Sequence, residues 1–340
     1  MIIVLAAMLW GLGTASSAAE ATELGELQEK IVIAHRGASG YLPEHTLEAV
    51  ALAYGMGADF IEQDLVLTKD GVPLVLHDIH LDTTTNVRKR FPDRARADGR
   101  WYVIDFTLEE IKSLDVHERI DVAKNSTVFP GRFPLGHAEF EVPTFVEEIE
   151  LIQGLNKSMG RNVGIYPELK APAFHTREGY DMGKIVLDIL ALYGYKGPNA
   201  NIYLQCFDHP YLKRLREELG TELPLIQLIG KGRGYDYLVT AEGLNEIATY
   251  ANGIGPAIER IVHYEPGSPL MITNLVLDAH ARGLAVHPYT FRKDSLPAYA
   301  NTLEELLRMC YFVIGVDGIF TDFPDLAIKL LTAAGYHHAP

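Results

Sequence analysis

Apolar runs of strand length alternate with amphipathic segments of helix length along most of the chain, and this alternation most constrains the fold. The strand-like runs cover residues 31–35, 60–67, 73–78, 163–170, 202–207, 223–229, 253–257, 284–291 and 318–323. Apolar strands separated by helices are typical of a parallel sheet covered by helices. About eight such repeats in one chain predict a distorted TIM (β/α)8 barrel. An open, doubly wound sheet is the alternative.

The run at 73–78 is surplus, because a barrel of this kind has places for eight strands. Only Lys69-Asp70-Gly71 clearly separates it from the run at 60–67, which is far too short for a parallel crossover. We therefore expect 73–78 to fold back antiparallel on 60–67. That pairing sets His77 roughly opposite Asp64.

Residues 79–143 contain no clear barrel unit and are rich in Arg, Asp, Pro and Gly. They predict an inserted subdomain after the second barrel strand, on the catalytic rim. Six basic residues lie close together there: Arg88, Lys89, Arg90, Arg94, Arg96 and Arg100. They form either a solvated loop with Asp93 and Asp98 as partners, or a positive rim that attracts an anionic substrate.

The N-terminal segment has the pattern of an export signal. Residues 2–13 are almost wholly apolar, and the small residues Ser17-Ala18-Ala19 follow. The run is too short to anchor the chain in a bilayer, and the small residues suit a signal peptidase. We expect residues 1–19 to be a signal peptide and 20–340 the exported chain, periplasmic or secreted, although no Lys or Arg precedes Lys30.

Charge and cysteine content exclude other classes. The chain has 30 basic and 45 acidic residues, a net charge of −15, which argues against binding to nucleic acid or to an anionic membrane surface. The two cysteines, Cys206 and Cys310, each lie alone in an apolar run. They form no metal-ligand spacing, and we expect buried free thiols, with one long-range disulfide as the alternative.

Polar residues gather at the ends of the predicted strands, where the functional groups of a (β/α) barrel project. They are His35, Arg36, Glu62, Asp64, His77, Asp78, Glu168, Lys170, Gln205, His287, Tyr289, Thr321 and Asp322, together with Phe207. Glu62 and Asp64 are two residues apart and therefore lie on the same face of their strand. Glu168 and Lys170 have the same spacing.

The carboxylates Glu62, Asp64 and Glu168 would all face the mouth of the barrel, where they cannot be buried ionised without compensation. Taken singly, each is better explained by a salt bridge. Taken together, they predict a divalent cation, and oxygen ligands favour Ca²⁺ or Mg²⁺ over Zn²⁺.

Two histidines, His35 and His77, join this cluster and fit a general acid and a general base, because imidazole titrates near neutral pH. Arg36 and Lys170 are positive charges that could neutralise a phosphoryl group in its transition state. A cation, two histidines, an arginine and a lysine favour phosphodiester cleavage over the isomerisation of a sugar.

Seven ordered motifs between about residues 31 and 331 resemble the glycerophosphodiester phosphodiesterases. They are His35-Arg36-Gly37, Pro43-Glu44-His45-Thr46, Glu62-Gln63-Asp64, His77-Asp78, Pro167-Glu168-Leu169-Lys170, Gln205-Cys206-Phe207 and Thr321-Asp322-Phe323-Pro324. The stretches FPDRARADGRWY and PGRFPLG resemble the exported, periplasmic branch of that family.

The resemblance implies a distorted TIM barrel with an inserted subdomain that hydrolyses glycerophosphodiesters, such as glycerophosphocholine and glycerophosphoethanolamine, to sn-glycerol 3-phosphate and an alcohol. It implies that Glu62, Asp64 and Glu168 bind one divalent cation, expected to be Ca²⁺. The remaining implied roles are acid–base catalysis by His35 and His77, phosphate binding by Arg36 and Lys170, and substrate contacts by Gln205, Phe207 and Tyr289.

Several alternatives stay open. Many members of the family have Asn where this chain has His45, so Glu44 is either a neighbour of the metal or, as we favour, a helix-start residue. The nucleophile is either water or the 2-hydroxyl of the substrate, which would give a cyclic phosphate first. Two rival functions are a lyase acting on intact lipid, resembling phosphatidylinositol-specific phospholipase C or sphingomyelinase D, and an exported phosphodiester-binding protein without activity.

Overall fold

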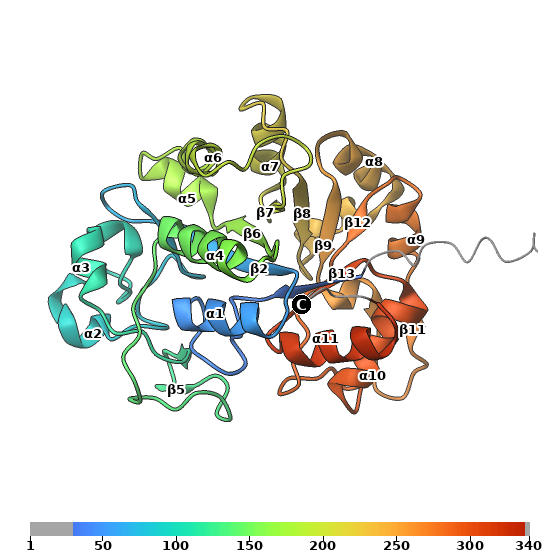
Figure 1. The fold of residues 1–340 in the computed structure, drawn as a ribbon, viewed down its shortest axis with the longest axis horizontal. Helices are drawn as coiled ribbons and strands as arrows, with labels where there is room; N and C mark the ends of the chain where they lie inside the picture. The colour runs from blue at the N-terminus through green and yellow to red at the C-terminus, as the bar shows by residue number, and fades with distance from the viewer. Residues whose placement is uncertain (1–29, 337–340) are drawn as a thin grey trace, which may run out of the picture.

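Eight parallel strands form the centre of the described structure, in the order β12-β9-β8-β7-β6-β2-β1-β13 (Figure 1). The computed structural model describes residues 30–336, so the predicted signal peptide, residues 1–19, lies outside the described residues. The strands are β1 (Ile31–Ala34), β2 (Phe60–Leu67), β6 (Gly164–Leu169), β7 (Leu204–Cys206), β8 (Leu225–Ile229), β9 (Gly253–Pro256), β12 (Ala285–Val286) and β13 (Gly318–Thr321). Each lies within a predicted apolar run, and the predicted parallel barrel is confirmed.

The barrel closes between β12 and β13 through irregular backbone, without regular strand pairing. Beyond the short β12, the chain runs alongside β13. The amide of Phe320 donates to the carbonyl of Pro288 (3.0 Å), and the amide of Phe291 donates to the carbonyl of Phe320 (2.8 Å). These bonds make the sheet a nearly closed barrel, distorted at this seam.

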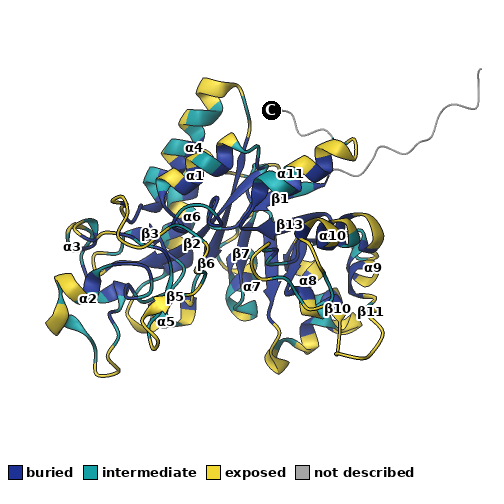
Figure 2. Ribbon diagram, turned by 90° about the horizontal axis from the view of Figure 1, so that it is seen from below, coloured by how far each residue is buried: buried dark blue, intermediate teal, exposed yellow. Residues whose placement is uncertain are grey.

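Helices cover the outside of the barrel, and their inner faces are buried (Figure 2). They are α1 (Leu47–Gly55), α4 (Phe145–Met159), α5 (Pro172–Arg177), α6 (Met182–Leu192), α7 (His209–Glu217), α8 (Ala241–Tyr250), α9 (Leu275–His280), α10 (Leu303–Arg308) and α11 (Pro324–Ala333). In α4, Thr144 and Glu147 form a capping box that fixes the first turn. Phe145, Ile149 and Ile152 then fall on one buried face, as helical periodicity requires.

Large side chains from different strands fill the interior of the barrel below the strand ends. They are Ile33, Phe60, Tyr166, Ile226 and Phe320. The hydroxyl of Tyr166 lies 2.9 Å from Nδ1 of His287, which is buried here and belongs to the core. The barrel is therefore packed, and any substrate has to bind at its end.

The ninth apolar run is β3 (Pro73–Val75), which pairs antiparallel with β2 as predicted. The register differs from the expectation by one residue. Leu65 pairs with Val75, and the amide of Leu76 donates to the carbonyl of Asp64 at 2.8 Å. Leu76 therefore lies opposite Asp64, and His77 is one residue further along.

The segment at 79–143 lies at one side of the barrel and contains α2 (Val87–Arg90), α3 (Leu108–Lys112), β4 (Ile120–Asp121) and β5 (Ser126–Thr127) (Figure 1). Its apolar side chains form a separate cluster that packs on β2 and β3; the cluster includes Val66, Leu74, Leu81, Trp101, Phe106 and Ile111. The segment thus has apolar packing apart from the main core, and its description as an inserted subdomain stays a prediction.

The basic cluster of this segment does not pair as predicted. Arg94 binds Glu110 (2.9 Å), Arg96 binds Asp105 (2.7 Å), and Arg100 binds the buried Asp82 (2.8 Å). The expected partners were Asp93 and Asp98, but chain folding brings more distant carboxylates closer. None of the six basic residues lines the cavity described below. Arg94 and Arg100 form ion pairs within the segment, and Arg96 also reaches Glu178 outside it, at 3.0 Å.

Both cysteines, Cys206 and Cys310, are buried free thiols, as predicted. Among residues 30–336, none of the helices combines the length and the apolar character that crossing a membrane requires.

Glu148 on α4 gives a test of this packing. Burial raises the pKa of its carboxyl to about 8, from an ordinary value of 4.5. The folded protein then holds a proton that the unfolded chain has lost, so Glu148 destabilises the fold increasingly as pH rises between these two values. We expect Glu148→Gln to gain stability relative to the wild type by about 1.4 kcal/mol for each pH unit in that window.

The measurement is urea unfolding of both proteins at about pH 5 and about pH 8, within the window set by the two pKa values. The exposed Glu150 on the same helix supplies the control variant, Glu150→Gln. A stability difference between Glu148→Gln and wild type that is the same at both pH values would contradict the assignment.

Candidate active site

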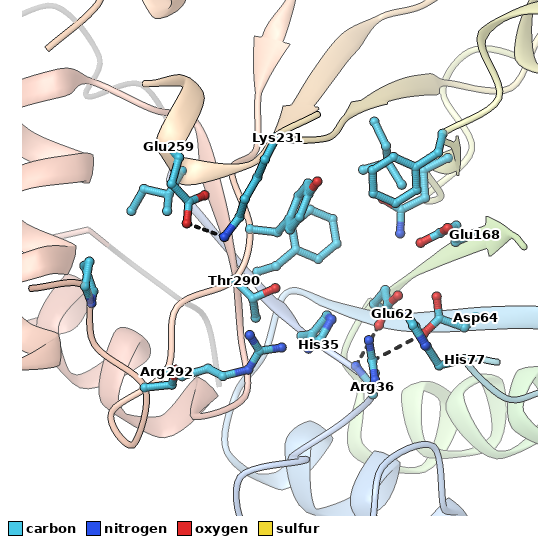
Figure 3. A pocket seen from close by; sticks show the side chains of 18 of the residues that line it. His35, Arg36, Glu62, Asp64, His77, Glu168, Lys231, Glu259, Thr290 and Arg292 are labelled. Atoms are coloured by element: carbon cyan, nitrogen blue, oxygen red, sulfur yellow. Dashed lines mark hydrogen bonds and ion pairs between the residues drawn. The ribbon is translucent and has the colours of Figure 1, made fainter. Parts of the chain in front are cut away.

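A cavity of about 460 Å³ lies at the carboxyl ends of the barrel strands (Figure 3). All ten site residues predicted from the sequence line it: His35, Arg36, Glu62, Asp64, His77, Glu168, Lys170, Gln205, Phe207 and Tyr289. The strand-end rule therefore identified residues that the fold brings together.

The turn after β1 places two of these side chains. Arg36 and Gly37 both have positive φ angles, of 59° and 76°. A Cβ atom on residue 37 would lie 2.8 Å from the carbonyl carbon of Ala49, so only glycine fits at this position. The turn directs the amide of Arg36 to Oε2 of Glu62, 2.7 Å away. His35 and Arg36 are thereby fixed beside the carboxylates of β2.

Glu62 and Asp64 are both buried on the same face of β2. Burial and the neighbouring Asp64 raise the pKa of Glu62 well above its ordinary value. Burial also opposes ionisation of Asp64, but the positive charge of Lys170 and other nearby groups lowers its pKa well below the usual range. Two such carboxylates side by side need further positive charge if both are to be ionised.

Glu168, on β6 next to β2, pairs in register with Asp64. Its Oε1 lies 2.8 Å from Nζ of Lys170, which is also 3.4 Å from Oδ1 of Asp64. Burial, with the charge of Asp64, raises the pKa of Glu168 to about 7 despite the opposing effect of Lys170. Lys170 thus connects the two carboxylates that would otherwise repel each other.

The residues present fit a bound cation. Oδ1 of Asp64 is buried and accepts no hydrogen bond from the described part of the chain. Ligand atoms of His45, Glu62 and Asp64 lie within 4.8 Å of one another. The predicted trio of carboxylates is thus only partly assembled, because His45 joins Glu62 and Asp64 in this group while Glu168 pairs with Lys170.

From the sequence, His45 was given no site role and Glu44 was either a neighbour of the metal or, as favoured, a helix-start residue. The structure gives both of them partners in the site. Nε2 of His45 lies 2.8 Å from Oδ2 of Asp64, and Glu44 binds Nη1 of Arg36 at 3.0 Å. The motif leads into α1 as expected, but Thr46 caps the helix. Glu44 is therefore an ion-pair residue, and the expectation that it starts the helix was wrong.

Each of the two site histidines is oriented by an aspartate. Nδ1 of His35 lies 2.7 Å from Oδ1 of Asp322, and Nδ1 of His77 lies 2.6 Å from Oδ1 of Asp78. Because a carboxylate only accepts, Nδ1 carries the proton, and Nε2 of each ring is available for chemistry. Burial, reinforced by Arg36, lowers the pKa of His35 to about 4 and that of His77 to about 3.

Phe207 and Tyr289 form an aromatic wall of the cavity. Their ring centroids are 5.8 Å apart and nearly perpendicular. Nζ of Lys170 lies 5.8 Å from the centroid of Phe207. Gln205 lies beside Glu168 in the sheet register, and its Oε1 is buried and accepts no hydrogen bond from the described residues. These groups offer apolar contact and one free acceptor to a small polar molecule.

Sequence reasoning missed the other end of the cavity, where Lys231 and Glu259 form an ion pair and Thr290 and Arg292 add polar groups (Figure 3). These residues follow β8, β9 and β12 by several positions. A strand-end rule extended a few residues into each following loop would have found them.

A barrel whose strand ends carry two aspartate-paired histidines, an acidic group that could hold a cation and fixed positive charges has the groups expected of an enzyme of the TIM-barrel class. The family model described as the glycerophosphoryl diester phosphodiesterase family matches residues 35–326. The chain belongs to this family.

Curated relatives are similar in sequence to this chain over most of their length. The chain is 45% identical over 327 residues to the glycerophosphodiester phosphodiesterase of Haemophilus influenzae, covering 89% of this chain and 90% of that protein. It is 36% identical to the enzyme of Treponema pallidum, covering 90% and 93% of the two chains.

Solved structures share the fold. The crystal structure of a Silicibacter pomeroyi protein has a TM-score of 0.70 at 27% identity and covers 93% of this chain and 97% of its own. A phosphodiesterase from Oleispira antarctica, solved with its product sn-glycerol-3-phosphate, has a TM-score of 0.62 at 21% identity and covers 89% and 97%.

Proposed function

We propose that the protein hydrolyses glycerophosphodiesters, including glycerophosphocholine and glycerophosphoethanolamine, to sn-glycerol 3-phosphate and an alcohol. The observation that carries the proposal is the pair of histidines, each fixed through Nδ1 to an aspartate, in one cavity with an acidic cluster and two positive side chains. The activity named for the Haemophilus and Treponema relatives supports it, as does the product bound in the Oleispira structure.

Glu62, Asp64 and Glu168 are proposed to hold one divalent cation, Ca²⁺ or Mg²⁺. All three line the cavity, whereas His45 does not and instead bonds to Asp64, so His45 is assigned to orienting that carboxylate. Oxygen ligands suit both ions. The bound cation would offset negative charge on the phosphoryl group.

Arg36 and Lys170 are proposed to contact the phosphate. Both side chains are largely buried, with exposed fractions of 12% and 13%, and both already lie among carboxylates. A phosphodiester anion entering the cavity would find fixed donors that need little rearrangement, which favours binding of developing charge. Gln205, Phe207 and Tyr289 would then contact the glycerol side of the substrate.

His35 and His77 are proposed to share the proton transfers. One Nε2 removes a proton from the nucleophile, and the other donates a proton to the departing alkoxide. Because their pKa values are lowered, the neutral form of both rings is favoured in the free site and either can accept the proton. The negative charge of a bound phosphodiester would raise the pKa of the partner that acts as the acid. The nucleophile is water or the 2-hydroxyl of the glycerol, and a transient cyclic phosphate would identify the latter.

Residues 1–19 are proposed to be a signal peptide that directs the chain to the periplasm or the medium. The apolar run and the small residues that follow it support this part of the proposal.

The reaction is tested by measuring release of sn-glycerol 3-phosphate from glycerophosphocholine by residues 20–340. We expect excess EDTA to abolish release and one of Ca²⁺ or Mg²⁺ to restore it, because the acidic cluster needs a cation to act. Absence of release from a folded protein with either cation would contradict the proposal, and intact lipid would then be tested as substrate.

His35→Ala and His77→Ala are each expected to lower kcat by at least about 10²-fold, the low end of acid–base contributions. The fold should be retained, because each ring faces the cavity and replacement leaves the aspartate with other donors. His263→Ala, at an exposed position on β10 (Val262–His263), is the matched control. Near-normal turnover of either site variant would remove that histidine from the chemistry.

Glu62→Gln and Glu168→Gln are expected to raise the cation concentration that gives half-maximal activity, since each removes a charged ligand. His45→Gln should leave that concentration much closer to the wild-type value. A titration in which His45→Gln is shifted and Glu168→Gln is not would assign the third ligand to His45 instead.

A further inference from the structure

Two arginines of the inserted segment, Arg119 and Arg132, extend toward the active site with largely buried side chains, and neither lines its cavity. Their side chains are only 16% and 4% exposed. Buried arginines require carboxylate partners, and the partners here are not the nearest ones in the sequence. Each arginine instead binds an aspartate that orients one of the two site histidines.

On one side, Nη1 of Arg119 lies 2.6 Å from Oδ2 of Asp78. The other oxygen of that carboxylate, Oδ1, accepts from Nδ1 of His77 at 2.6 Å. The remaining nitrogens of Arg119 fork onto Glu44, at 2.9 and 2.6 Å. Asp78 is thus held between the histidine and a guanidinium that is itself fixed at a second point.

On the other side, the arrangement repeats with different residues. Nη2 of Arg132 lies 2.6 Å from Oδ2 of Asp322, and Oδ1 of the same carboxylate accepts from Nδ1 of His35 at 2.7 Å. Arg132 also forks onto Asp294, at 2.8 and 3.1 Å. The two histidines therefore have the same chain of contacts, although their aspartates come from distant parts of the sequence.

We propose that Arg119 and Arg132 are positioning residues, through which the inserted segment fixes the aspartates that orient His77 and His35. This inference rests on the proposed function, because it assigns a task to groups that act through the two histidines. A guanidinium is required at each position because its planar fork binds two carboxylates at once, whereas a lysine offers one compact charge.

The two aspartates, Asp78 and Asp322, do not depend equally on the arginines of the inserted segment. Asp322 has a second arginine, Arg292 of the barrel, whose Nε lies 2.6 Å from Oδ2. For Asp78 the other contact is the hydroxyl of Thr83, at 2.7 Å. Removing Arg119 should therefore disturb its histidine more than removing Arg132 does.

The test compares Arg119→Ala and Arg132→Ala with wild type in the release of sn-glycerol 3-phosphate from glycerophosphocholine. We expect kcat to fall about 10–100-fold for Arg119→Ala, as for partners that orient a catalytic ligand, and roughly 3–10-fold for Arg132→Ala. The matched control is Arg94→Ala, which removes an ion pair to Glu110 within the same segment. That control should keep wild-type turnover.

Double variants separate positioning from a general structural effect. If Arg119 acts through His77, Arg119→Ala added to His77→Ala should lower kcat less than twofold further, and Arg132→Ala added to His35→Ala should behave likewise. A structural disturbance would still lower the residual activity of each histidine variant by the full factor seen in the wild-type background. That multiplicative result would overturn the proposal.

Thermal melting establishes that each variant is folded. If an alanine variant does not fold, Arg119→Lys or Arg132→Lys replaces it, because lysine keeps the buried charge but cannot bind both carboxylates. If Arg119→Lys and Arg132→Lys are each folded and each keep wild-type kcat, the inference is overturned. An inactive wild-type protein would instead overturn the proposed function, so the two failures are distinguishable.

Discussion

The repulsion between two buried carboxylates, Glu62 and Asp64, is the constraint on which the rest of the site depends. They share one face of β2 because residues two apart in a strand must do so. Positive or donating groups surround them on every side: the amide of Arg36, the ring of His45 and the ammonium of Lys170. The turn after β1 places the amide of Arg36 beside Glu62, and the register between β2 and β6 places Lys170 beside Asp64.

The positive charges that offset these carboxylates also affect the protonation of the two histidines in the cavity. Burial, together with the positive charges that hold the carboxylates, lowers the pKa values of His35 and His77, which favours the neutral form of both rings. The aspartates beside them counteract this effect and fix the direction of each ring. Binding an anion and transferring a proton are therefore linked, because the phosphate would partly neutralise the charges that keep the imidazoles deprotonated.

Most of the barrel was predictable because its strands are short, mainly apolar runs that alternate about eight times with helix-length segments. The ten residues at strand ends were predictable for the same reason, since chain position alone places them at one rim. The contacts that loops make could not be predicted in this way. The one-residue offset between His77 and Asp64 depends on the geometry of a tight turn. Pairing of Arg96 with Asp105, and of Arg132 with Asp322, depends on how a long irregular segment packs, which local pattern does not encode.

The pairing of β1 with β13 joins the two ends of the described chain. Val32 pairs with Ile319, and Ile33 pairs with Phe320, across almost three hundred residues. Such non-local pairing carries a large entropic cost, since the whole intervening chain must be brought back before β13 can reach β1. Until then β1 has a bare edge, and His35 lacks Asp322. Closing the barrel between β1 and β13 therefore also brings Asp322 to His35, so one long-range pairing supplies both a structural contact and the partner of a site histidine.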